Sequence, residues 1–388
     1  MMYIAFNIIS SMRIVFPVLF LLLSAPQLFA QSTAAEYFEL GKTKYLEGDY
    51  KGAIIEFSKA TNLSHGHAAS FSMLGKCKVK IGDLKGAKED FTFLIGINKR
   101  DYYAWVDRGS TKVLMGDQVG AYKDLEKAIK INDNLPIAHL EMGKACFSFG
   151  KYEDALESLD KAISLDSLNK ESFCYRGRTK TRQKEYIAGI VDLDKALALN
   201  VKYEDALLAR GKAKSKFGDH KGAIEDFAQL IAVNPKNKEG YFERAMVLKK
   251  QKEFNAAIVD FEKVMELDSS DYDAVNNLGF LKVESGDFTG AIAVFDQLVQ
   301  KDPENAFAYN NRGFAKYKAN DIPGAFADID KSISMVQNNS YAFRNRALVN
   351  LADKSPVSAC KDMKKAIKLG FTEKYGDEIE KLILKHCK

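Results

Sequence analysis

Residues 204–237 read EDALLARGKAKSKFGDHKGAIEDFAQLIAVNPKN and contain two short amphipathic helical patterns separated by a Gly-Asp pair. Small and apolar residues recur on one face of each pattern, such as Gly211 in the first and Phe227 in the second. Neither helix is long enough, or apolar enough on all sides, to be stable alone. The stretch therefore needs neighbours of the same kind. The chain supplies them, because the unit recurs every 34 residues from about Ala34 to nearly the C-terminus.

Three positions of the unit keep their character through ten consecutive units. A small residue in the first helix recurs from Gly41 to Ala347, and a second small residue recurs twelve positions later, from Ala53 to Ala359. Because a side chain larger than a methyl group would force closely crossing helices apart, both ladders predict tight helix contacts. A large apolar residue supplies the volume that packs one unit on the next. The turn between the two helices carries a residue suited to the left-handed conformation in seven units: Gly48, Gly82, Gly116, Gly150, Gly218, Gly286 and Asn320.

This pattern of small, small and large residues resembles the tetratricopeptide repeat family over residues 34–373, as ten units of 34 residues. The resemblance implies an all-α fold, a right-handed superhelical solenoid of antiparallel helix pairs. A length of 388 residues would otherwise suggest two or three domains, but a stacked array grows along one axis without separate cores. Residues 374–388 form one more amphipathic pattern, which we interpret as a C-terminal capping helix.

The N-terminus has the layout of a secretory signal peptide over residues 1–30. An unbroken apolar run from Ile14 to Leu23 follows Arg13, and Ala30 offers a small residue before a plausible cleavage point. Translation from Met12 would give a more ordinary signal. We therefore expect an exported protein, periplasmic or secreted, without stable membrane insertion after cleavage. An uncleaved segment that anchors the chain in the membrane is the competing interpretation.

Arginine and aspartate recur together in six units, sixteen residues apart. Arginine precedes the first small residue, and aspartate lies in the second helix of the same unit. The pattern predicts structural ion pairs within each of these units, since a guanidinium suits a partly buried bidentate contact. The predicted pairs are Arg108 with Asp124, Arg176 with Asp192, Arg210 with Asp226, Arg244 with Asp260, Arg312 with Asp328, and Arg346 with Asp362.

Cys360 and Cys387 are candidates for a disulfide that would clamp the end of the array, in a protein that export would expose to oxidising conditions. The spacing alone leaves the bond undecided, because a disulfide requires a close approach of the two Cβ atoms. Cys146 and Cys174 fall within helical core patterns and are interpreted as small buried apolar residues.

In the family that the pattern resembles, first-helix residues line a concave groove that binds other proteins. Basic residues dominate this row in the middle units, and aromatic residues follow toward the C-terminus. The functional interpretation is a surface that attracts acidic segments, and the alternative is a solvated polar face. The predicted contacts are Arg178, Arg182, Lys212, Lys216, Lys249, Phe280, Phe314 and Tyr317.

Asn277, Asn311 and Asn345 recur at the 34-residue spacing in the last three units. This row is similar to the asparagine ladders of peptide-binding members of the family. An amide both donates and accepts, so such a row can hold an extended peptide by its backbone. The alternative is that these amides satisfy polar groups of neighbouring helices.

Catalytic and cofactor motifs are absent from the sequence: we find no Gly-rich phosphate loop, no nucleophile elbow and no set of metal ligands. His65 and His67 lack acidic or Cys ligands nearby, so we predict no metal and no cofactor. The expected function is a non-enzymatic scaffold that binds a protein or peptide partner. Nucleic-acid binding through the basic middle units is the alternative, but export and the near balance of 57 Lys and Arg against 52 Asp and Glu disfavour it.

Overall fold

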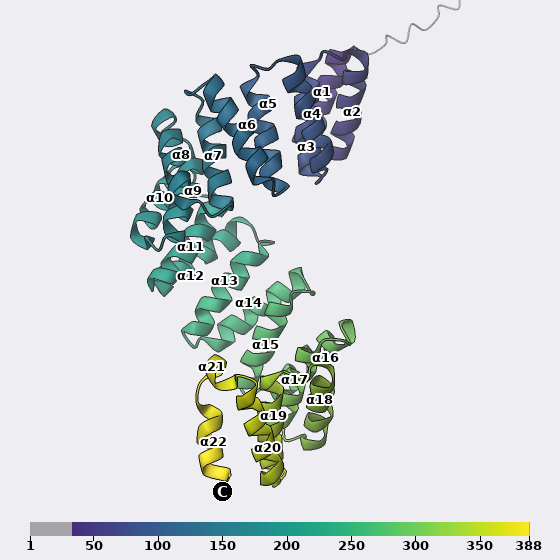
Figure 1. Cartoon of the computed structure of the whole chain (residues 1–388), viewed down its shortest axis with the longest axis vertical. Coiled ribbons are helices and arrows are strands. Elements are labelled where there is room, and N and C mark those ends of the chain that lie inside the picture. The colour runs from purple at the N-terminus through teal and green to yellow at the C-terminus, as the bar shows by residue number, and fades with distance from the viewer. Residues whose placement is uncertain (1–32, 388) are drawn as a thin grey trace, which may run out of the picture. The chain divides into compact units, whose positions relative to one another are not determined.

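The computed structural model describes residues 33–387, and these residues form 22 helices and no strand (Figure 1). The predicted signal peptide, with its alternative start at Met12, lies outside the described residues. The fold is all-α, as the periodicity predicts. No helix in the described part of the chain combines the length and the apolar character that a bilayer span requires.

The chain divides into two units, residues 1–117 and 118–388. In the first unit, the helices are α1 (Ala34–Leu46), α2 (Tyr50–Leu63), α3 (Ala68–Lys80), α4 (Leu84–Ile97) and α5 (Tyr102–Leu114). In the second unit, they are α6 (Gln118–Ile131), α7 (Pro136–Ser148), α8 (Tyr152–Leu165), α9 (Lys170–Arg182), α10 (Tyr186–Leu199), α11 (Glu204–Phe217), α12 (His220–Val233), α13 (Lys238–Lys250), α14 (Phe254–Leu267), α15 (Tyr272–Glu284), α16 (Phe288–Lys301), α17 (Ala306–Lys318), α18 (Ile322–Met335), α19 (Ser340–Ala352), α20 (Pro356–Lys368), α21 (Phe371–Tyr375) and α22 (Glu378–His386).

Helices α1 to α20 alternate as first and second helices of a 34-residue period that starts at Ala34. We number the repeats along the chain from residue 34, so that repeat four is residues 136–169 and repeat five is residues 170–203. Within each of the two units, a first helix packs on the second helix that follows it. In repeat six, a Cβ atom at Gly211 would collide with the ring of Phe227, which is fully buried. The small residue therefore allows the close crossing that buries the aromatic ring.

The turn between the helices of a repeat uses the same backbone conformation in all ten repeats. Gly218 ends α11 with φ of 103°, and Asn320 takes φ of 65° at the same place in repeat nine. Lys184, Lys252 and Lys354 also adopt positive φ here, with values of 68°, 62° and 58°. Sequence reasoning did not identify these three turns, because a lysine gives no sign of a left-handed conformation.

A short capping motif begins many of the second helices. The carboxylate of Asp219 accepts a hydrogen bond of 2.9 Å from the backbone N–H of Gly222, three residues on. A Cβ atom at Gly222 would meet this carboxylate, so the glycine leaves room for the cap. The same Asp and Gly spacing begins α2, α4, α16 and α18, which explains why these helices start where they do.

The C-terminal segment forms two helices rather than one. Phe371 begins the short α21, inside the predicted tenth unit, and α22 follows. Ile379 of α22 is fully buried against a cluster that includes Phe343 and Met363. Cys360 of α20 and Cys387 form a disulfide, with 5.7 Å between their Cα atoms. The remaining cysteines of the described residues, Cys77, Cys146 and Cys174, are free and buried.

Candidate partner-binding surface on the first helices

The predicted groove residues of the second unit lie on its first helices. Arg178 and Arg182 belong to α9, Lys212 and Lys216 to α11, and Lys249 to α13. Phe280 and Asn277 belong to α15, Phe314, Tyr317 and Asn311 to α17, and Asn345 to α19. We call this set of residues the first-helix face.

Two basic residues of this face already have partners within the chain. Lys212 forms an ion pair with Glu239 and a second one of 3.2 Å with Glu243, both on α13. The guanidinium of Arg178 lies 4.9 Å from the ring centre of Phe147 and 4.7 Å from that of Tyr175. These contacts connect one repeat to the next, so they explain the two side chains without an external ligand.

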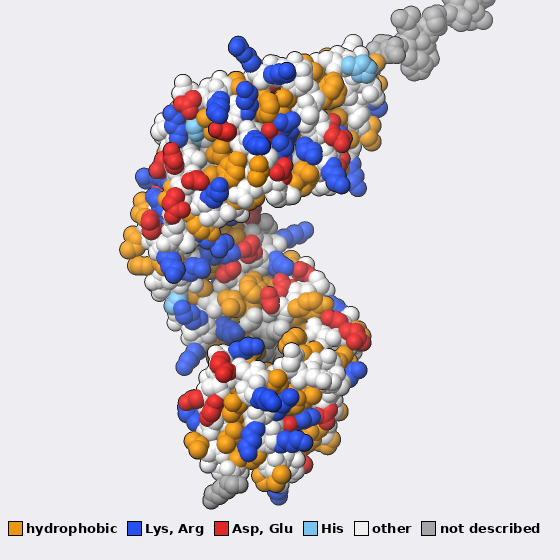
Figure 2. Space-filling view, viewed as in Figure 1, with side chains coloured by type: hydrophobic (Ala, Val, Ile, Leu, Met, Phe, Trp, Pro, Cys, Tyr) orange, Lys and Arg blue, Asp and Glu red, His pale blue; other side chains and the backbone are white. Residues whose placement is uncertain are grey.

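Other basic residues of the face are more accessible. Arg182 and Lys216 stand near the ends of their helices and are exposed. On the side that Figure 2 shows, basic, acidic and hydrophobic side chains are interspersed over the second unit, without a broad zone of one charge. On that side, the cations do not form the continuous stripe that tracks a nucleic-acid backbone.

The asparagine ladder is bonded within the protein. Asn277 accepts a hydrogen bond of 2.7 Å from Lys249 and donates one of 2.8 Å to the backbone carbonyl of Asp273. Asn311 donates to Asn276 of the preceding first helix at 3.0 Å and accepts from its neighbour Asn310 at 3.1 Å. These amides therefore join successive first helices, as the alternative interpretation of the row proposes.

Asn345 requires a correction. Its side chain is fully buried, donates to Asn310 of α17 at 3.0 Å and accepts from Arg344 at 2.8 Å. An amide buried between two helices and bonded on both sides does not present its polar atoms to a peptide. Sequence reasoning missed the partner positions Asn276 and Asn310, because they precede the ladder by one residue and pair across two repeats.

The apolar residues of the first-helix face differ in exposure, as do two residues on the same helices, Met246 of α13 and Phe307 of α17, which we add to the face. The side chains of Met246, Phe280 and Phe307 are 38%, 44% and 58% exposed. Phe314 is partly buried, with the ring of Tyr317 at 6.0 Å and the guanidinium of Arg344 at 5.3 Å. Met246, Phe280 and Phe307 are therefore accessible on the first helices of repeats seven to nine, whereas Phe314 and Tyr317 contribute mainly to packing.

Lys249 differs from the other lysines of the face. Its ammonium lies 5.4 Å from the ring centre of Phe280, and the amide of Asn277 accepts its hydrogen bond. Burial lowers the pKa of Lys249, and within the described residues no carboxylate forms an ion pair with it. Lys144, on α7, makes an instructive contrast, because Glu141 and Glu171 both pair with it and raise its pKa despite burial. Lys249 is thus a partly desolvated cation beside exposed apolar groups.

The structure contains five of the six predicted pairs of arginine and aspartate. In each of these repeats, Nε and Nη2 of the arginine donate to the two oxygens of the aspartate sixteen residues later, with distances between 2.5 and 3.0 Å. The aspartates are almost fully buried. The contacts join Arg176 to Asp192, Arg210 to Asp226, Arg244 to Asp260, Arg312 to Asp328 and Arg346 to Asp362. Arg108 and Asp124 belong to different units of the chain, so their pairing stays a prediction.

Four of these arginines have a second partner that sequence reasoning missed. Nη1 of Arg176 donates to Asp160, which lies sixteen residues before it on the second helix of the preceding repeat. Arg210, Arg312 and Arg346 contact Asp194, Asp296 and Asp330 in the same way. A comparison of the positions sixteen residues before each arginine would have found these acceptors. One guanidinium therefore connects three consecutive helices.

Comparisons with known proteins agree with this repeat architecture. A family model described as "TPR repeat" matches residues 281–320, and two described as "Tetratricopeptide repeat" match residues 208–274 and 137–167. A search of curated proteins gave no match.

Similar solved structures include a tetratricopeptide repeat protein from Parabacteroides merdae, at 22% identity and a TM-score of 0.48 over 64% of this chain and 98% of that one. The pilF protein of Pseudomonas aeruginosa is 20% identical, with a TM-score of 0.47 over 53% of this chain and 95% of its own. MamA is 29% identical, with a TM-score of 0.38 over 42% of this chain and 94% of its own. The matched residues 137–167, 208–274 and 281–320 fold into the alternating first and second helices described above. This chain therefore contains tetratricopeptide repeats in these segments.

Proposed function

We propose that this protein is a non-enzymatic scaffold that binds an extended segment of a partner protein on the first-helix face of repeats seven to nine. Tetratricopeptide repeats generally mediate interactions between proteins. The observation that carries the proposal is Lys249, a partly buried cation without a carboxylate partner among the described residues, beside the exposed side chains of Met246 and Phe280. A partner carboxylate would complete this site, and apolar partner groups would cover the two exposed side chains.

The asparagine row has a smaller part in this proposal than the sequence suggests. Asn277 lies next to Lys249 and keeps its place at the site, whereas Asn345 serves the packing of α17 on α19. Nothing in the described contacts or in the comparisons favours nucleic-acid binding. Export remains part of the proposal, and N-terminal sequencing of the mature protein tests it: a chain that begins at Gln31 supports cleavage.

Site-specific photo-cross-linking in the cells of origin tests the surface. A photoreactive residue at Phe280 is expected to give a discrete adduct with a partner, whereas one at Val259, which is 63% exposed on the second helix α14, is the control. Lys249→Glu should reduce the Phe280 adduct at least tenfold by repelling the partner carboxylate. Lys250→Glu, at the adjacent exposed lysine, should change it little. Equal adducts at both positions, or equal effects of both substitutions, would refute the proposal.

A further inference from the structure

Repeat four differs from every other repeat at two positions of its first helix that lie four residues apart, one turn from each other. We call the arginines that connect three consecutive helices the bridging arginines. The first of the two positions is the one that they occupy, and the second lies four residues later. In each of the other nine repeats at least one of these positions carries a cation: Lys44, Lys78, Arg108, Lys112, Arg176, Lys180, Arg210, Lys214, Arg244, Lys282, Arg312, Lys316 and Arg346. Repeat four has Met142 and Cys146 there. It is thus the repeat in which neither position supplies a positive charge.

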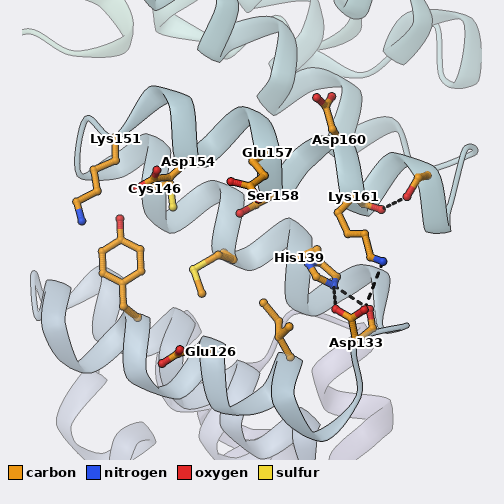
Figure 3. Close-up of a pocket in the computed structure, with 14 residues that line it drawn as sticks. Glu126, Asp133, His139, Cys146, Lys151, Asp154, Glu157, Ser158, Asp160 and Lys161 are labelled. Carbon is orange, nitrogen blue, oxygen red and sulfur yellow. Dashed lines mark hydrogen bonds and ion pairs between the residues drawn. The ribbon is translucent and has the colours of Figure 1, made fainter.

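An open cavity of about 890 Å³ occupies this place. Its lining residues come from α6, α7 and α8 and from the connections between them, and Met142 and Cys146 of the first helix α7 form part of its floor. Figure 3 shows Glu126 on one side of the cavity and Glu157 and Ser158 on the opposite side. The cavity therefore lies between two consecutive second helices, which are the helices that the arginine connects in other repeats.

The acceptor positions of the missing arginine are still present. Glu126 lies sixteen residues before Met142 and Ser158 sixteen residues after it, as Asp160 and Asp192 do around Arg176. Within the described residues, the ion pair of Glu126 is the one with Lys130, one turn along the same helix, and both side chains are largely exposed. Repeat four thus lacks the donor but has polar groups on both sides of its place.

The lining of the cavity is acidic although the chain carries a formal net charge of +5. It includes five carboxylates against two lysines. Lys161 lies 3.4 Å from Asp133, which also accepts a hydrogen bond from His139 through its backbone carbonyl (Figure 3). Lys151 lies over the ring of Tyr122, whose buried hydroxyl has no hydrogen-bond partner among the described residues. Asp160 is also paired, with Arg176, and Glu126 with the largely exposed Lys130. Asp154 and Glu157 add negative charge to the lining, so the site favours a cation.

We propose that this cavity is a docking site for an arginine side chain of a partner protein. The guanidinium would lie between Glu126 and Ser158, and its aliphatic stem would pack on Met142. Arginine suits the place better than lysine, because a planar fork reaches acceptors on two helices at once, as the bridging arginines of repeats five, six, nine and ten do. Peptide-borne arginine suits it better than the free amino acid, because the α-carboxylate of free arginine would be repelled by the acidic lining.

Fluorine NMR of short labelled peptides tests this site on the full-length chain. The probe is trifluoroacetyl-Ala-Arg-Ala-amide, compared with the same peptide carrying citrulline, which keeps the shape and removes the charge. The fluorine signal of the arginine peptide is expected to broaden as protein is added, and the binding curve should saturate. The citrulline peptide should bind at least tenfold more weakly. Equal binding of the two peptides, or tighter binding of free arginine, would overturn the proposal.

Two variants locate the binding. Met142→Arg with Ser158→Asp rebuilds the internal bridge and should abolish binding of the arginine peptide; unchanged binding by this variant, shown to be helical by circular dichroism, would place the ligand elsewhere. Should the variant misfold, Glu126→Gln decides, because that side chain is 60% exposed. Glu126→Gln should weaken binding of the arginine peptide at least fivefold. Glu262→Gln, sixteen residues before Leu278 of repeat eight as Glu126 is before Met142, should leave binding unchanged. A larger effect of Glu262→Gln than of Glu126→Gln would contradict the assignment.

Discussion

Arg176 and Asp192 form a two-pronged contact across the helices of repeat five, with Nε and Nη2 of the arginine 2.9 and 2.6 Å from the two carboxylate oxygens. Lys180 adds a third hydrogen bond of 2.7 Å to the same carboxylate. Burial alone would raise the pKa of Asp192, but the bonds from Arg176 and Lys180 outweigh it and lower the pKa below its ordinary value. The two cations therefore keep a buried carboxylate ionised.

Asp192→Asn should destabilise the protein by about 3–5 kcal/mol at neutral pH, because it removes the buried charge that Arg176 and Lys180 share and leaves Arg176 only its exposed partner Asp160. Since the folded-state pKa of Asp192 is depressed, its stabilising contribution is present above the unfolded pKa of about 3.9 and is lost as pH falls through the folded value. Urea unfolding from pH 7 down to pH 3 should thus show the gap between wild type and variant closing below about pH 4. A gap that stays constant would contradict this assignment.

Asp90 serves as a control, because its pKa is shifted in the opposite direction from that of Asp192. Burial raises its pKa, and the single ion pair with Lys78 does not compensate. An acid with a raised folded-state pKa loses stability as pH rises through that pKa. The gap between wild type and Asp90→Asn should therefore shift in favour of the variant as pH rises from 3 to 6.

Lys252→Gly should stabilise the protein by about 1 kcal/mol, because Lys252 holds a left-handed conformation that costs an L-residue about 1–2 kcal/mol. The urea midpoint measures the change. Lys250→Gly is the matched control, because this lysine is the last residue of helix α13 and does not have a positive φ, so glycine there should destabilise by up to about 1 kcal/mol. Two changes of the same sign would rule out the conformational explanation.

Asn345→Ala should destabilise the protein by about 1–3 kcal/mol, because it leaves the buried side-chain oxygen of Asn310 without its hydrogen-bond donor. Asn277→Ala should cost less, since Asn277 is only partly buried. Chemical denaturation of the two single variants gives the comparison. If Asn345→Ala proved neutral for stability and weakened partner binding instead, the peptide-binding interpretation of this residue would be restored.

Reduction of the disulfide between Cys360 and Cys387 should loosen the C-terminal end alone. The bond closes a loop with a sequence separation of 27, for which chain entropy predicts about 3–4 kcal/mol. Amide hydrogen exchange in α22 should accelerate in Cys387→Ser, along with loss of the contact between Arg344 and Glu378. Protection in α7 to α14 should be unchanged. Accelerated exchange throughout the second unit would show that the bond supports more than the end of the array.

The fold could be predicted because its signals are local and repeat within one chain. The small residues mark the helix crossings, and the pairing of Arg176 with Asp192 emerges from comparing repeats at one fixed spacing. The disulfide could not be decided from sequence, because its geometry depends on how α22 folds back on α20. The burial of Asn345 was missed for a similar reason: its environment is set by the approach of α17 to α19, which no single repeat encodes.

Because a bridging arginine bonds an aspartate in its own repeat and one in the preceding repeat, it also limits how repeats can be removed or exchanged. Asp160 at the end of repeat four faces Arg176 of repeat five, and Asp194 faces Arg210 of repeat six. Excision of residues 170–203 would bring Asp160 opposite Arg210 and leave the new junction charge-balanced. Loss of residues 340–373 would instead leave Asp330 without its cation. Each of the four junctions that such an arginine crosses thus has its own charge requirement, and removal or exchange of a repeat there should be tolerated best where the new neighbours keep both the arginine and the aspartate sixteen residues before it.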